Sequence, residues 1–230
     1  IEQNWWKVIL GKFAGCVLAI GGGLALGREG PSVQIGAMIG KGFSRRNRRL
    51  LTEERMLMTC GAGAGLAAAF GAPLAGAIFS LEELHKNFSA EVLISTMAAA
   101  AMADYVAVNI IGLTPVFDFD VTHRLPLRYY WAVLILGAIL GVFGAFYNRV
   151  IAWMQDAFDK LGSNRFKMTF IMSVAFVLMF AYPLALGSGN ELVAQISSGD
   201  FALRALIVML IVKFFFSTAS FGSGSPGGIF

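Results

Sequence analysis

The chain has 230 residues, of which 57% are hydrophobic and only 14% are charged, and its mean hydropathy is +0.70. Soluble domains carry nearly twice this fraction of charged residues, so the composition excludes an ordinary soluble domain. The net charge of +4 is small. Because the positive residues cluster at the ends of apolar segments, they indicate membrane orientation, and we expect no nucleic-acid partner.

Six apolar segments follow one another along the chain, each close to the ~20 residues that cross the hydrocarbon core. They lie near Val8–Leu26, Met56–Leu81, Val92–Phe117, Tyr129–Asn148, Met168–Asn190 and Phe201–Phe221. The alternating strands of a transmembrane barrel are absent from the sequence. The segments therefore predict an all-α polytopic membrane protein, embedded in the lipid bilayer as an integral multi-pass protein. We expect its location to be the bacterial inner membrane.

The first apolar segment is followed directly by "GREGP", residues Gly27 to Pro31, where a membrane helix would otherwise continue. Proline at the start of a helix sacrifices no hydrogen bond, so Pro31 predicts a new helix from Ser32 to about Phe43. The amides of Glu29, Gly30 and Ser32 would then project from the positive end of that helix. Such an end inside a membrane is an anion site, because it offers donors without a full positive charge.

Glu29 has two interpretations. It is either a permanent capping carboxylate or a titratable plug, which occupies the anion site when ionised and leaves it when protonated. Intramembrane carboxylates usually belong to functional sites, which favours the plug. The neighbouring Arg28 either raises the local anion concentration at the entrance or is an interfacial residue with its charge in water.

The second apolar segment contains "AFGAPLAG", residues Ala69 to Gly76, whose glycines and proline predict a reversal between two short, tilted helices. The basic loops near residues 41–49 and 160–167 lie on the cytoplasmic side, and loop 112–126 lies outside, only if the chain reverses here. Glu82 and Glu83 follow this reversal. They are either a solvated helix end or a proton pickup site, since carboxylates are unfavourable at a helix C-terminus.

The sequence ends on a second break, "GSGSPGGIF", with the amides of Gly228, Ile229 and Phe230 after its proline. Both breaks follow an apolar helix that contains Lys-Phe, a weak symmetry typical of inverted-repeat transporters. We predict the C-terminal part of a first transmembrane repeat over residues 1–112, an extracytoplasmic linker over 113–127, and the N-terminal part of a second repeat over 128–230. Four-residue glycine spacings at Gly61/Gly65 and Gly137/Gly141 predict close helix packing.

Three motifs together resemble the CLC family of chloride channels and chloride/proton antiporters. They are "GREGP" at residues 27–31, "GLAAAFGAPLAG" at 65–76 followed by "LEE" at 81–83, and "SPGGIF" at 225–230. The resemblance implies a CLC-type inverted repeat with broken and tilted helices, and a homodimer in which each subunit has its own pore. Residues 56–83 and 91–111 would contribute helices to the dimer interface. Gly71 departs from the family pattern, which usually has asparagine there.

The resemblance also implies roles for single residues. Glu29 matches the glutamate that gates the anion path and carries the proton, and Glu83 matches the internal proton-transfer glutamate of the exchangers. The amides of Ile229 and Phe230 match central anion ligands. The expected anion-binding set is Arg28, Glu29, Gly30, Gly228, Ile229 and Phe230.

We therefore expect chloride/proton antiport, with chloride and protons as substrates. The alternatives are a passive voltage- or pH-gated chloride channel and an antiporter for another anion such as fluoride. The chain is expected to be a fragment, because the selectivity serine and the coordinating tyrosine of the family lie outside it. We expect neither an enzyme nor a cofactor or metal site, since the HExxH and GxSxG patterns are absent and no histidine lies within a span.

Overall fold

A computed structural model describes residues 3–86, 89–112, 126–199 and 201–229 of the chain. Over these residues the regular structure is helical, apart from one isolated bridge that pairs Gly27 with Gly228. The predicted all-α class is confirmed. The predicted extracytoplasmic linker lies almost entirely outside the described residues.

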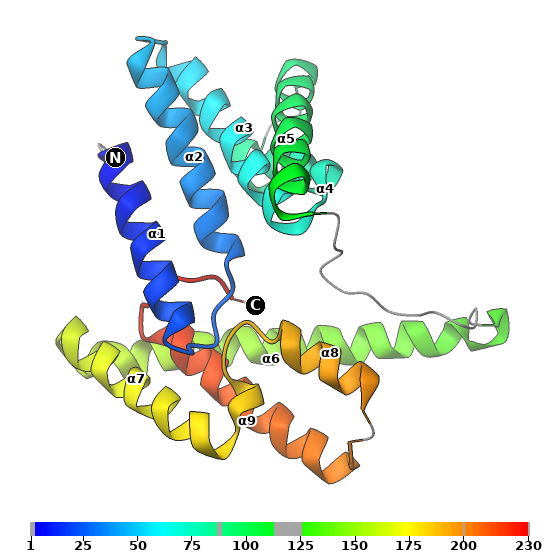
Figure 1. Ribbon diagram of the computed structural model, residues 1–230. Helices are drawn as coiled ribbons and strands as arrows, with labels where there is room; N and C mark the ends of the chain where they lie inside the picture. Colours follow the sequence, from blue (N-terminus) through cyan, green and yellow to red (C-terminus); the bar gives the residue numbers. More distant parts are fainter. Residues whose placement is uncertain (1–2, 87–88, 113–125, 200, 230) are drawn as a thin grey trace. The chain divides into compact units, whose positions relative to one another are not determined.

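The helices run in the order shown in Figure 1. Their bounds are α1 Trp5–Gly21, α2 Glu29–Arg46, α3 Leu51–Phe70, α4 Pro73–Phe79, η1 Ser80–His85, α5 Ala90–Ile111, η2 Leu127–Tyr129, α6 Tyr130–Lys160, α7 Asn164–Ala181, η3 Pro183–Ala185, α8 Asn190–Ser198 and α9 Leu203–Gly222. The described residues form two compact units. The first comprises those within 1–21, 26–116 and 226–230, and the second those within 22–25 and 117–225.

A glycine seam joins α2 and α3 in the first unit, where the two helices lie side by side (Figure 1). A Cβ added to Gly36 would overlap the carbonyl oxygen of Gly61, and one added to Gly65 would overlap that of Ser32. One added to Gly40 would overlap the carbonyl oxygen of Leu57. The residue numbers on α3 fall as those on α2 rise, so the two helices are antiparallel. Their backbones are in direct contact at these glycines. The packing role predicted for Gly61 and Gly65 is confirmed.

The chain reverses between α3 and α4, as the sequence predicts. Gly71 ends α3 in the left-handed conformation at φ +65°, and Pro73 opens α4. A Cβ on Gly76 would lie 2.6 Å from the carbonyl oxygen of Gly63, so α4 folds back along α3. The buried alanines Ala67, Ala77 and Ala100 join α3, α4 and α5 in one small core.

The second unit contains a helix break that is absent from the prediction. The predicted segment Met168–Asn190 is not one helix, because α7 ends at Ala181 and a loop containing the short η3 follows. Pro183 has no N–H to donate, and it disfavours helical geometry at Tyr182. Gly187 and Gly189 then take positive φ angles of 66° and 95°.

Within this unit, α9 packs against the long α6. Phe214 of α9 contacts the rings of Phe143, Phe146 and Tyr147 on α6. In contrast, a Cβ added to Gly137 or Gly141 would meet no atom within 4 Å. The close packing predicted for this second glycine pair is therefore wrong for the part of the chain that the structure describes.

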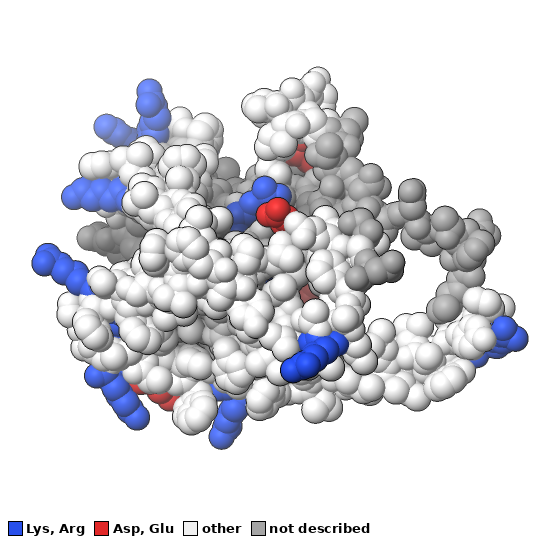
Figure 2. Space-filling view, turned by 60° about the horizontal axis from the view of Figure 1, so that its bottom comes forward, with Lys and Arg blue, Asp and Glu red and all other residues white. Residues whose placement is uncertain are grey.

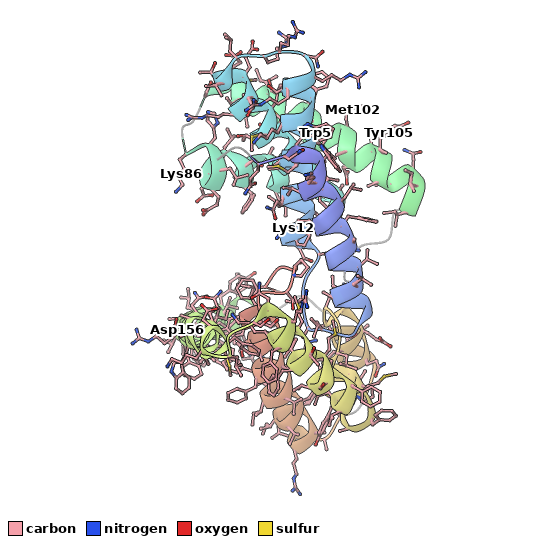
Figure 3. The ribbon with its side chains drawn as sticks, turned by 90° about the vertical axis from the view of Figure 1, so that its left-hand side faces the viewer. Trp5, Lys12, Lys86, Met102, Tyr105 and Asp156 are labelled. Carbon is pink, nitrogen blue, oxygen red and sulfur yellow. The ribbon has the colours of Figure 1, made fainter. Side chains whose placement is uncertain are left out.

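The surface suits a bilayer better than water. Four helices are long and apolar enough to span a membrane: α5, α6 together with η2, α7 and α9. Large apolar side chains stand exposed on them, including Met102 and Tyr105 on α5 (Figure 3). Figure 2 shows wide uncharged areas between scattered lysine and arginine side chains. A soluble monomer rarely exposes apolar surface on this scale.

Ion pairs close the two hairpins that carry the basic loops. Arg45 at the end of α2 pairs with Glu54 of α3 at 2.6 Å. Lys167 of α7 pairs with Asp159 of α6 at 2.7 Å. These contacts join neighbouring helices at the ends that the positive-inside rule assigns to the cytoplasm.

Candidate anion and proton site

The helix that carries the candidate gate begins earlier than predicted. α2 starts at Glu29 and not at Ser32, because the amide of Ser32 already donates to the carbonyl of Arg28 at 3.0 Å. Pro31 fits this earlier start, since any position in the first turn lacks an intrahelical acceptor. The amides of Glu29 and Gly30 have no backbone acceptor among the described residues, whereas that of Ser32 is occupied. The donors at this end are thus Glu29 and Gly30.

Two reciprocal hydrogen bonds bring the two sequence breaks together. The amide of Gly27 donates to the carbonyl of Gly228 at 3.0 Å, and the amide of Gly228 donates to the carbonyl of Gly27 at 2.7 Å. A Cβ on Gly15 of α1 would lie 2.6 Å from Cγ of Pro226, so α1 supports this pairing from one side. In this conformation the amide of Gly228 is used by Gly27 and is not free for an anion.

The side chain of Glu29 lies against this pairing. Its Oε2 atom is buried and has no hydrogen-bond partner among the described residues. A Cβ built on Gly228 would lie 3.6 Å from that oxygen and 3.0 Å from the nitrogen of Gly30. A carboxyl oxygen, a helix-terminal amide and a glycine without a side chain therefore converge on one place. A buried carboxylate oxygen without a donor is costly unless the group is protonated or a ligand or water completes it.

Arg28 is exposed, and its Nη2 atom donates to the carbonyl of Ala69 at 3.2 Å. Ala69 belongs to the last turn of α3, whose carbonyls lack intrahelical partners. Arg28 therefore ties the start of α2 to the end of α3. It also lines a hollow of about 310 Å³ between α1 and α2, together with Phe13, Cys16 and Ile35.

The remaining anion-binding candidates are only partly described. Ile229 directly follows the paired Gly228, and its side chain is 40% exposed. Phe230 lies outside the described residues. The roles predicted for the amides of both residues stay predictions.

Glu83 is exposed and lies in η1, a π-helical turn that continues α4. With Glu82 it lines a hollow of about 690 Å³ beside Ile78 and Phe79. Two residues further on, His85 lines a hollow with Thr52 and Met56 from the start of α3, whereas Arg28 contacts the end of α3. Glu29 and Glu83 thus lie toward opposite ends of α3, and no hydrogen-bonded chain of described residues joins them.

The chain matches a protein-family model described as "Voltage gated chloride channel" over residues 1–230. Among curated proteins, it is 36% identical over 235 residues to the H(+)/Cl(-) exchange transporter ClcA of Vibrio vulnificus strain YJ016, covering 99% of this chain and 50% of that protein. It is 38% identical over 238 residues to ClcA of Vibrio cholerae, with the same coverage. The chain therefore spans about half the length of the curated relatives it matches.

Two solved structures share the fold. A slow cyanobacterial Cl⁻/H⁺ antiporter superposes with a TM-score of 0.92 at 31% identity, covering 100% of this chain and 55% of the antiporter chain. A CLC-type fluoride/proton antiporter superposes with a TM-score of 0.75 at 22% identity, covering 96% of this chain and 55% of the other. The second likeness concerns the fold alone.

These findings agree with the expectations from the three motifs. The apolar helices and the bacterial relatives support an integral membrane protein of the bacterial inner membrane. The broken helices and the antiporter neighbours identify the predicted CLC-type architecture. With a family model matched from end to end, the chain belongs to the voltage gated chloride channel family.

Proposed function

We propose that a transporter containing this chain exchanges chloride for protons, with Glu29 as both the gate and a proton carrier. The observation that carries the proposal is the buried, unpartnered Oε2 atom of Glu29 beside the amide of Gly30 and the backbone of Gly228. The relatives named as exchange transporters support it, as does the solved Cl⁻/H⁺ antiporter. The proposal involves no covalent chemistry, cofactor or metal.

The proposed cycle follows from charge competition at the start of α2. An ionised Glu29 carboxylate occupies the positive helix end, where an anion would otherwise bind. Protonation removes its negative charge and with it the competition for the amides of Glu29 and Gly30. The anion then enters, and the displaced carboxyl group holds the proton. One group therefore links anion entry to proton uptake.

Glu83 supplies the second proton-handling position in this proposal. It is exposed toward the opposite end of α3, where it exchanges protons with water. The described residues provide no side-chain relay between Glu83 and Glu29, so the proposal assigns the intervening transfer to water.

Parallel measurements of chloride and proton flux test the proposal. A full-length transporter carrying this sequence is reconstituted in liposomes, and both fluxes are followed across a pH gradient. Chloride moving down its gradient should drive protons uphill. Glu29→Gln, which keeps the shape of the side chain but cannot ionise, should abolish proton movement and remove most of the pH dependence of chloride flux.

Glu83→Gln should stop proton movement while chloride still flows, and Glu82→Gln is the matched control on the same turn. Proton flux that persists in Glu83→Gln would show that the assignment of Glu83 is wrong. Chloride flux in the unaltered protein without uphill proton movement would identify a passive channel. A preference for fluoride in the same assay would change the substrate and leave the gate assignment intact.

A further inference from the structure

Lys213 lies in the interior of α9, a helix apolar enough to span the membrane. Its ammonium donates to three backbone carbonyls, those of Ala185 at 3.0 Å, Leu186 at 3.3 Å and Gly187 at 2.7 Å. The ion pairs found among the described residues do not include Lys213. A charged side chain within a membrane segment is costly and usually has a function. The charged ammonium of Lys213 is therefore hydrogen-bonded to neutral backbone carbonyls and not to a carboxylate.

The three carbonyls belong to the loop that follows α7. This loop starts with η3 and continues to Gly189, and it has no long helix of its own to satisfy its backbone. An ammonium group has three donors and no acceptor, so one lysine satisfies three neighbouring carbonyls. Charge-assisted hydrogen bonds of this kind are stronger than those between neutral groups. Lys213 therefore fixes the path of residues 185–187.

The fixed loop in turn holds the segment that precedes "GREGP". The amide of Gly187 donates to the carbonyl of Gly23 at 3.2 Å. Gly23 has a positive φ of 86°, and a Cβ on it would lie 3.2 Å from Cδ2 of Leu186. The next residue, Leu24, is fully buried. Along the chain this clamped segment continues through Ala25 and Leu26 into Gly27 and the start of α2.

We propose that Lys213 is a positioning residue for Glu29. It acts through the backbone, by fixing the loop that clamps Gly23, and so limits the freedom of the chain that leads into Glu29. Lys213 itself contacts neither the carboxyl group nor the anion. The effect on transport rests on the proposed function of Glu29, whereas the backbone clamp does not.

Three variants separate positioning from charge and from general stability. Lys213→Met keeps most of the side-chain length and removes the donors, and Lys213→Arg keeps a charged donor group. Arg204→Met is the control, because Arg204 is an exposed cation on the same helix and no hydrogen bond or ion pair involves it within the described structure. If Lys213→Met does not fold, Lys213→Gln replaces it, because its side chain is polar but neutral and one atom shorter, and should weaken the same three hydrogen bonds.

Hydrogen exchange in a full-length protein carrying this sequence tests the clamp. Lys213→Met should speed exchange at the Gly187 amide and at the amides of residues 22–28, but not in α3 and α4. Lys213→Arg and Arg204→Met should exchange like the unaltered protein. Unchanged protection of residues 22–28 in Lys213→Met would overturn the proposal.

Flux measurements test the consequence for Glu29. In Lys213→Met the ratio of anion flux to proton flux should rise about threefold to tenfold, the range expected if the loosened loop loses its one backbone hydrogen bond from Gly187 to Gly23. The pH dependence of anion flux should flatten. A proportional fall of both fluxes with an unchanged pH profile would indicate a merely structural lysine and overturn the inference. If the unaltered protein shows no coupled flux, the proposed function fails, and the exchange experiment still decides the clamp.

Discussion

At the scale of single residues, Gly228 offers the sharpest test of the convergence at Glu29. Gly228→Ala would place a methyl group 3.0 Å from the nitrogen of Gly30 and 3.6 Å from Oε2 of Glu29, in the space that the carboxylate or an anion would share. We expect anion affinity to weaken about tenfold, equivalent to about 1.4 kcal/mol, as measured by calorimetric titration of chloride into the full-length protein.

The matched control is Gly21→Ala. Gly21 is the last residue of α1, and its φ angle is not positive. A Cβ added to it would meet no atom within 4 Å. This variant should bind chloride like the unaltered protein. Equal affinities for Gly228→Ala and Gly21→Ala would show that the anion site does not include the space beside Gly228.

At the scale of helices, the two glycine pairs predict opposite effects of the same substitution. Gly61→Ala forces a methyl group into the carbonyl of Gly36 and should destabilise the protein by about 1–3 kcal/mol or more, as overpacking does. Gly137→Ala meets open space on α6 and should stabilise it by about 0.5–1 kcal/mol, because alanine restricts the unfolded chain. The melting temperatures of the two variants are measured in the same detergent. Equal shifts from the unaltered protein would contradict the close packing of α2 and α3 at these glycines.

The break between α3 and α4 predicts a stabilising substitution. Gly71 has φ +65°, a backbone angle that asparagine tolerates. A Cβ added to Gly71 would lie 3.8 Å from Oδ1 of Asp104, and this buried oxygen has no hydrogen-bond partner among the described residues. The amide of Gly71→Asn should donate to that oxygen and stabilise the protein by about 1 kcal/mol. In a double-mutant cycle with Asp104→Ala the gain should disappear. A gain that persists without Asp104 would assign it to another contact.

The sequence predicts elements better than it predicts their contacts. Glycine and proline at "GREGP" and "AFGAPLAG" act on the backbone of their own residues, so the sequence alone predicts a helix break at each motif. The start of α2 lies three residues before the predicted one, at Glu29 and not at Ser32, because proline suits any residue of a first turn. Pro183 indicates the end of α7, but it lies within a charge-free apolar run, and such a run by itself predicts one continuous membrane segment. The Gly27–Gly228 pairing and the hydrogen bonds of Lys213 join distant segments, and no local pattern specifies them.

At the scale of the whole molecule, the family resemblance predicts a homodimer to which residues 56–83 and 91–111 contribute, which include most of α3, all of α4 and most of α5. A largely apolar hollow of about 760 Å³ lies on α4, η1 and α5, and it is lined by Leu74, Ile78, Leu81, Leu93 and Met97 together with Glu82 and Lys86. Leu74 is 59% exposed there and does not line the hollow that contains Glu83, and Leu134 on α6 is 77% exposed on a predicted lipid-facing helix. A bulky side chain disrupts a packed interface but is accommodated by fluid lipid, so the two positions should respond differently to tryptophan.

We expect Leu74→Trp to shift the full-length protein from dimer to monomer in chemical cross-linking, whereas Leu134→Trp stays dimeric. Because each subunit is expected to have its own pore, chloride and proton flux per subunit should be retained in both variants. Loss of coupled flux in a folded Leu74→Trp monomer would mean that the site depends on the partner subunit. A dimer that dissociates only in Leu134→Trp would move the interface from α4 and α5 to α6.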